Sequence, residues 1–206
     1  MAHPITSLWL FMMPKAQATT MVPLNLDQIV SASDTIVRGT VSEIWSEQDA
    51  RTGTIWTHAQ VDISVVLKGD HINDKIIIEQ PGGQYGHLGT IVEGVARFSV
   101  GEEGYFFIEE LESDRNVTVG MFQGKYNVRL DPYSQEEIVV RFPVHPAREF
   151  DHRFIPLPEE QNRVFVKSFE LEVLESVEAG WNNISIPGVS DQKLQLINTP
   201  KLNGGQ

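Results

Sequence analysis

The chain has 206 residues, enough for one well-buried domain with tails, and it contains no cysteine. The lack of cysteine excludes disulfides, thiolate metal ligands and cysteine nucleophiles. A formal net charge of -12 argues against nucleic acid as a partner, and beyond the N-terminus no apolar run approaches the roughly 20 residues of a membrane span.

The N-terminus has most features of a secretory signal peptide. The apolar run "ITSLWLFMM" (residues 5–13) is followed by Pro14 and by "AQA", a small-x-small pattern that ends at Ala18. The positively charged segment that usually precedes such a run is missing, so a buried or membrane-adhering N-terminal segment is the alternative. We expect residues 1–18 to be a signal peptide, and the protein to be periplasmic or secreted.

Strand patterns begin after "LDQIVSASD" (residues 26–34), which could form one or two helical turns. A β-branched strand is predicted over 35–45, then a polar turn that ends at Gly53, then a strand over 55–68 with a clear period of two. The residues predicted to share its buried face are Ile55, Thr57, Ala59, Val61, Ile63, Val65 and Leu67. At roughly 3.3 Å per residue this strand would span about 45 Å, so it must coil or bend, as strands of a small barrel do.

Six shorter β-like runs follow, separated by glycine, aspartate or asparagine. They are "KIIIEQ", "IVEGVARF", "GYFFIEEL", "VTVG", "KYNVRL" and "EEIVVRF". Many short strands with turn residues between them predict an all-β barrel or sandwich.

The C-terminal third has a different character. Residues 143–160 contain four prolines and are expected to form a surface loop. Residues 168–180 favour a short helix, with Ser168 as N-cap and Gly180 as the stop, although alternating apolar residues at its start would also fit a strand. The polar tail 182–206 is expected to be disordered, which leaves a single domain over residues 19–181.

The order of these segments resembles a known family. "ASDTIVRGTVSEI", a long strand ending in "VVLKGD", "KIIIEQP", a glycine-rich segment and "FSVGEEGYFFIEE" resemble the OB-fold-like domain of the tissue inhibitor of metalloproteinases superfamily. They also resemble a group of uncharacterised bacterial exported proteins that end in a segment like "QGKYNV". The similarity covers roughly residues 29–130.

The resemblance implies a small closed or partly open OB-like barrel, export, and a rim that binds protein. In the animal inhibitors an N-terminal cysteine, tied by a disulfide, binds the zinc of the protease. This chain has no cysteine, so that inhibitory mechanism is not implied here.

The glycine-rich segment 80–90 lacks the spacing of phosphate-binding loops. Strand residues are predicted after it, so no helix N-terminus would face a bound anion. Its four glycines are expected to hold positive-φ turn or bulge positions at a barrel corner, namely Gly82, Gly83, Gly86 and Gly89. Tyr85 and His87 at its tip are the candidate binding residues.

Two enzyme hypotheses stay open. "HPAREFDH" supplies the weak metal-ligand candidates His145, Glu149, Asp151 and His152, and a hydrolase could assemble an acid and a histidine in space. No G-x-S-x-G or H-E-x-x-H motif is present, and adjacent glutamates on a strand point to opposite faces.

A carbohydrate-binding module is the other alternative, with surface aromatic residues as a stacking platform. The aromatic candidates are Trp45, Trp56, Tyr85, Tyr105 and Phe107. The preferred hypothesis is an exported, non-enzymatic module that binds protein and needs no cofactor.

Overall fold

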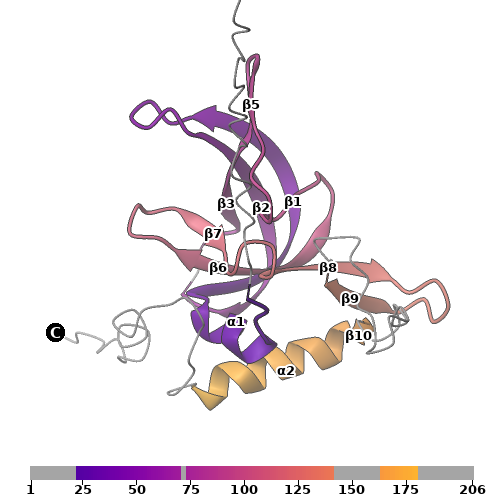
Figure 1. The fold of residues 1–206 in the computed structure, drawn as a ribbon. Coiled ribbons are helices and arrows are strands. Elements are labelled where there is room, and N and C mark those ends of the chain that lie inside the picture. Colours follow the sequence, from indigo (N-terminus) through magenta and orange to yellow (C-terminus); the bar gives the residue numbers. More distant parts are fainter. Residues whose placement is uncertain (1–21, 71–72, 142–162, 181–206) are drawn as a thin grey trace, which may run out of the picture.

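The computed structural model describes residues 22–70, 73–141 and 163–180 (Figure 1). The expected signal peptide, the proline-rich loop and the expected disordered tail lie outside these ranges. The described elements, in chain order, are α1 (Leu26–Ala32), β1 (Thr35–Gln48), β2 (Ile55–Lys68), β3 (Lys75–Pro81), β4 (Gly83–Tyr85), β5 (Leu88–Thr90), β6 (Glu103–Glu110), β7 (Asn116–Thr118), β8 (Lys125–Leu130), β9 (Glu137–Arg141), β10 (Arg163–Phe165) and α2 (Val166–Ala179).

The fold is mostly β, as predicted, and is built on one large antiparallel sheet. Its strand order is β10-β9-β8-β6-β1-β2-β3, with β7 paired to β6, while β4 and β5 form a separate two-stranded hairpin. β1 pairs with β2 along nearly its whole length and with β6 only over Thr35–Thr40. Three register irregularities interrupt the β1–β2 ladder, and both strands curve strongly (Figure 1). The long strand therefore bends, as its length required.

Closure of this sheet into a barrel is not found among the described strands. β7 approaches β3, but side chains make the connections in place of a strand ladder. Gln80 donates to Thr118 Oγ1 at 2.8 Å, and Asn116 Nδ2 donates to the carbonyl of Ile77 at 3.3 Å. A β7 of only three residues offers too little backbone for a ladder on both of its sides.

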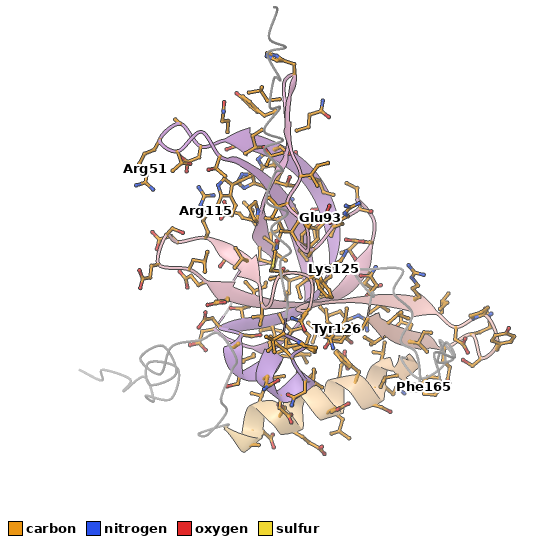
Figure 2. The ribbon with its side chains drawn as sticks, viewed as in Figure 1. Arg51, Glu93, Arg115, Lys125, Tyr126 and Phe165 are labelled. Carbon is orange, nitrogen blue, oxygen red and sulfur yellow. The ribbon has the colours of Figure 1, made fainter. Side chains whose placement is uncertain are left out.

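β6 is the central strand, and both of its faces are buried. Tyr105 and Phe107 point into the core beneath the helices, while Phe106 and Ile108 point into the core between the curved strands. The uninterrupted apolar run "YFFI" fits a strand that is buried on both sides. Tyr126 of β8 belongs to the helix-side core, whereas its neighbour Lys125 points to the opposite side of the sheet (Figure 2).

Helix α2 covers the lower face of the sheet together with α1 (Figure 1). Phe169 and Val173 form its buried stripe, and Gly180 ends it in the left-handed region with φ 51°. The helical interpretation of this segment is therefore confirmed. Ser168, however, lies inside the helix, which begins at Val166 after Phe165 as N-cap.

Arg38 of β1 ties α2 to the sheet. Its guanidinium donates to Glu103 of β6 at 2.7 Å and to Glu137 of β9 at 2.8 Å. It also lies 3.9 Å from Glu170 of α2, whose carboxylate accepts a 2.5 Å hydrogen bond from the hydroxyl of Tyr105. Three elements thus converge on one largely buried cation.

Two further strand predictions were wrong. Residues 91–98 form no strand and instead run as a loop between β5 and β6, because their apolar residues lack a regular alternation. Along β2 the predicted face is buried at Ala59 and Val61 but exposed at Val65, since the bend carries the end of the strand away from the core.

Candidate functional site

The hairpin of β4 and β5 projects from the end of the sheet (Figure 1). It follows β3 directly, and its root is fixed to β2. Gly82 donates its backbone N–H to the carbonyl of Ile55, and its own carbonyl accepts from the hydroxyl of Thr57, both at 2.8 Å. The hairpin then crosses the inner faces of β2 and β1, where Gly83 lies against the side chains of Thr57 and Ser46.

Two glycines explain the shape of this hairpin. Gly83 has φ 130°, and a Cβ there would lie 2.7 Å from Ser46 Oγ, so a side chain would have to displace the hydroxyl groups of Ser46 and Thr57. Gly86 at the tip has φ 60° and open space around it. The prediction of positive φ holds for Gly82, Gly83 and Gly86 and is wrong for Gly89, which lies in β5 with ordinary strand geometry.

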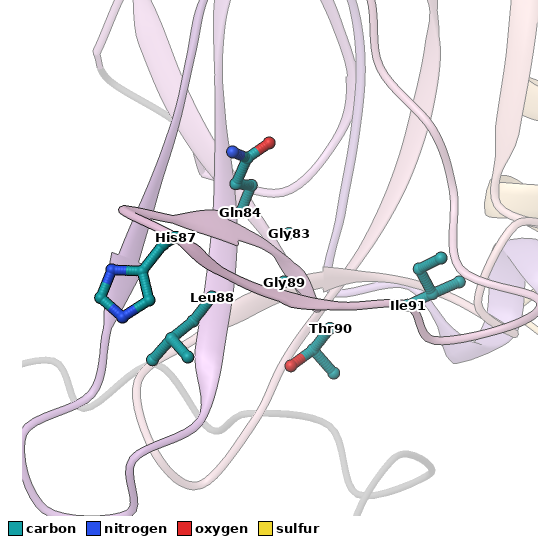
Figure 3. Close-up of a pocket in the computed structure, with 7 residues that line it drawn as sticks. All are labelled: Gly83, Gln84, His87, Leu88, Gly89, Thr90 and Ile91. Atoms are coloured by element: carbon teal, nitrogen blue, oxygen red, sulfur yellow. The ribbon is translucent and has the colours of Figure 1, made fainter.

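The predicted site residues Tyr85 and His87 flank Gly86 at the tip, and both are exposed. Three apolar side chains of the hairpin and its exit are also exposed: Tyr85 by 48 %, Leu88 by 48 % and Ile91 by 82 %. Sequence reasoning missed Leu88, because only the tip residues Tyr85 and His87 were singled out, and it missed Ile91, because residues 91–98 were expected to continue as a strand. His87 and Leu88 lie to one side of the hairpin, and Gln84 points to the other (Figure 3).

A hollow of about 540 Å³ borders the hairpin and is lined by Gly83, Gln84, His87, Leu88, Gly89, Thr90 and Ile91 (Figure 3). It is open to solvent, whereas a small-molecule site usually encloses most of its ligand. The hollow therefore favours contact with a large partner.

A second cluster lies on the outer face of β1, β2 and β3. Trp45 stacks on His58 with ring centroids 5.1 Å apart, and His58 Nδ1 lies 3.4 Å from a carboxylate oxygen of Glu79. Arg115, from the turn before β7, forms an ion pair with Glu79 and another, at 3.1 Å, with Asp49. Its guanidinium also lies 4.3 Å from the ring centroid of Trp56.

This outer cluster is organised as a clamp. Arg115 joins the β6–β7 connection to β3 and to the β1–β2 turn, which compensates for the missing ladder between β7 and β3. Backbone N–H groups of Thr52 and Arg51 hydrogen-bond the Asp49 carboxylate and lower its pKa, so it stays ionised beside Arg115. None of the described hydrogen bonds joins His58 to a serine or threonine hydroxyl, so no Ser-His-acid arrangement forms here.

The five aromatic residues considered as an alternative stacking platform do not share one exposed surface. Tyr105 and Phe107 are fully buried on β6, Trp45 is stacked on His58, and Trp56 lies beneath Arg115. Among the five candidates, only Tyr85 is exposed.

The four metal-ligand candidates between His145 and His152 lie outside the described residues. Within ranges 22–70, 73–141 and 163–180, no group of three or more histidine, aspartate or glutamate side chains could hold a metal ion. In the same ranges no helix is long and apolar enough to cross a membrane.

No protein-family model matches this chain, and no curated protein matches it. The candidate site therefore rests on the geometry described above.

Proposed function

We propose that this chain is an exported, non-enzymatic module that binds another protein through the β4–β5 hairpin. Tyr85, Leu88 and Ile91 supply the apolar contacts, and His87 supplies a polar one.

The observation that carries this proposal is the exposure of two large apolar side chains, Tyr85 and Leu88, on a hairpin with a fixed root, together with that of Ile91 directly after its second strand. Single exposed apolar residues are common on protein surfaces, but a group of them on one projecting element marks an interaction site. A fixed root also reduces the conformational entropy lost on binding.

The chemistry of the surface favours protein over other partners. A net charge of -12 repels nucleic acid, and the hollow beside the hairpin is too open to enclose a small molecule. Export is supported by the apolar run and "AQA" pattern at the N-terminus. The resemblance to OB-like domains of exported inhibitors supports both export and protein binding. In this proposal the sheet corresponds to a partly open form of that barrel.

Affinity capture with the full chain as bait tests this function, using periplasmic and secreted extracts of the source organism. A Tyr85→Ala/Ile91→Ala variant should lose the captured protein while keeping its melting temperature. Tyr133→Ala is the matched control, because Tyr133 is 85 % exposed but lies in the β8–β9 turn. Equal capture by all three forms would contradict the proposal.

A further inference from the structure

Among the described strands, none covers one edge of β1 next to the hairpin. β6 pairs with β1 only as far as Thr40, and the loop before β6 adds two bonds at Val41: its N–H donates to Glu102 at 2.9 Å, and its carbonyl accepts from Gly101 at 2.8 Å. Beyond that point, over residues 42–48, β1 pairs with β2 alone among the described strands.

The register shows which backbone groups point outward from this edge. Asp49 pairs with Thr54 through one bond, from its N–H to the Thr54 carbonyl at 2.8 Å, and its own carbonyl accepts from Gly53 at 2.8 Å, so both backbone groups of Asp49 point toward the β2 side. Residues with this orientation alternate along an antiparallel ladder. Trp45 and Glu47 therefore bond to β2, whereas the N–H and C=O groups of three residues point away from it: Ile44, Ser46 and Gln48.

Among the described residues, no strand pairs with β1 on this side beyond Val41, and none of the described hydrogen bonds reaches these outward groups. An edge with free donors and acceptors is a template for another strand. The hairpin adjoins it, because Gly83 of β4 lies against the Ser46 side chain. A strand added along β1 would therefore run beside β4 at the root of the hairpin.

The charges along this edge indicate which added strand would pair with it favourably. Glu43 and Glu47 are exposed here, on a chain that is acidic throughout. In an antiparallel pairing of two copies centred on Ser46, Glu43 would lie opposite Asp49 and Glu47 opposite Trp45 of the second copy, placing acid near acid. Like charges across a strand pair destabilise it, so the edge disfavours a second copy and favours a basic segment.

We propose that the partner protein adds an extended, basic segment as a new strand along Ile44–Gln48 of β1. This inference rests on the proposed function and specifies how the partner is held. Main-chain hydrogen bonds to the edge give affinity, and lysine or arginine side chains meeting Glu43 and Glu47 give selectivity.

The test uses short synthetic peptides in which lysine alternates with valine, isoleucine or threonine, added to the full chain. Residue-resolved hydrogen exchange should show fast exchange at Ile44, Ser46 and Gln48 in the free protein, because their N–H groups are unpaired, and slow exchange at Trp45 and Glu47. A bound peptide should slow exchange at the first three residues.

Proline substitutions remove the outward donors without touching the β1–β2 ladder. Gln48→Pro and Ser46→Pro should each weaken peptide binding about tenfold, whereas Gln48→Ala and Ser46→Ala keep it within about twofold. Two positions are tested because the Ser46 side chain also contacts Thr57. If Ser46→Pro fails to fold for that reason, Gln48→Pro still tests the effect of removing an outward donor. Glu43→Lys should weaken binding and make it less sensitive to salt.

The same variants are then compared in the capture experiment. Lost capture with the Tyr85/Ile91 variant but unchanged capture with both proline variants would overturn strand addition and leave hairpin binding intact. Failure of every peptide to slow exchange at the edge would also overturn strand addition. Protection of these amides at high protein concentration without peptide would show that a second copy occupies the edge.

Discussion

Gly83 and Gly86 lie three residues apart in the same hairpin but are required for different reasons. At Gly83 both the backbone conformation and the contact with Ser46 exclude a side chain, whereas at Gly86 only the conformation disfavours one. The sequence predicts that both are turn glycines, because glycine is the residue that adopts positive φ most readily. It cannot distinguish them, since the contact at Gly83 involves strands far away in the chain.

Alanine substitutions separate these two roles. Gly83→Ala should lower the free energy of unfolding by about 2–4 kcal/mol, because strain and a clash with the sheet act together. Gly86→Ala should cost about 1 kcal/mol, from strain alone. Urea denaturation of both variants measures the difference, and equal losses would show that the hairpin root is not packed as described.

Tyr105 gives the molecule a sensitivity to alkaline pH. Burial, together with its hydrogen bond to Glu170, raises the pKa of the Tyr105 hydroxyl above its ordinary value of about 10. Above pH of about 10 the unfolded chain releases this proton while the folded chain retains it, so the unfolded state binds fewer protons and stability falls as pH rises. Below that pH the group is neutral in both states and adds no pH dependence.

Tyr105→Phe should therefore reduce the decline in unfolding free energy above pH of about 10. The decline should persist in part, because burial also raises the pKa of Tyr126. Denaturation curves at several alkaline pH values measure the slope. An unchanged slope in Tyr105→Phe would show that this hydroxyl is not held in its neutral form by the fold.

At the scale of elements, the spacing of apolar residues predicted the features that depend on residues close together in the sequence. Helix α2 was found from the spacing of Phe169, Val173 and Val177, and the need for a bend in β2 followed from its length. The loop at 91–98 was missed, because isolated apolar residues pack against a core without forming a strand. The Arg115 clamp could not be foreseen either, since its partner Asp49 lies 66 residues away in sequence.

Among the contacts between elements, those of Arg38 should contribute most to the free energy of unfolding. Arg38→Gln leaves the carboxylates of Glu103, Glu137 and Glu170 close together without their shared cation. Hydrogen bonds to charged groups contribute about 1.5–3 kcal/mol each, but all three glutamates are partly exposed, so we expect a total loss of about 2–3 kcal/mol.

Thermal and urea unfolding at neutral pH measure this loss. Lys75→Gln is a suitable control, because its ion pair with Asp62 is exposed and should contribute less than about 1 kcal/mol. If the two variants lose similar stability, the Arg38 contacts contribute no more than an exposed ion pair does, and the expectation is wrong.

At the scale of the whole molecule, the two ends of the protein differ in structure. The helices and the Arg38 contacts stabilise one end, and the other end carries the β4–β5 hairpin and the open edge of β1 (Figure 1). The sequence predicted a binding rim at Tyr85 and His87, but not the open edge, because strand pairing depends on where β6 and its preceding loop leave β1.

The most direct test of this account is a hydrogen-exchange comparison of the full chain alone and in complex with the partner recovered by capture. Protection should appear at residues 84–91 of the hairpin and at Ile44, Ser46 and Gln48 of the β1 edge, with no change in the β8–β9 turn around Tyr133 or along α2. Protection of that turn or of α2, with unchanged exchange in the hairpin, would place the interaction at the opposite end and contradict the account.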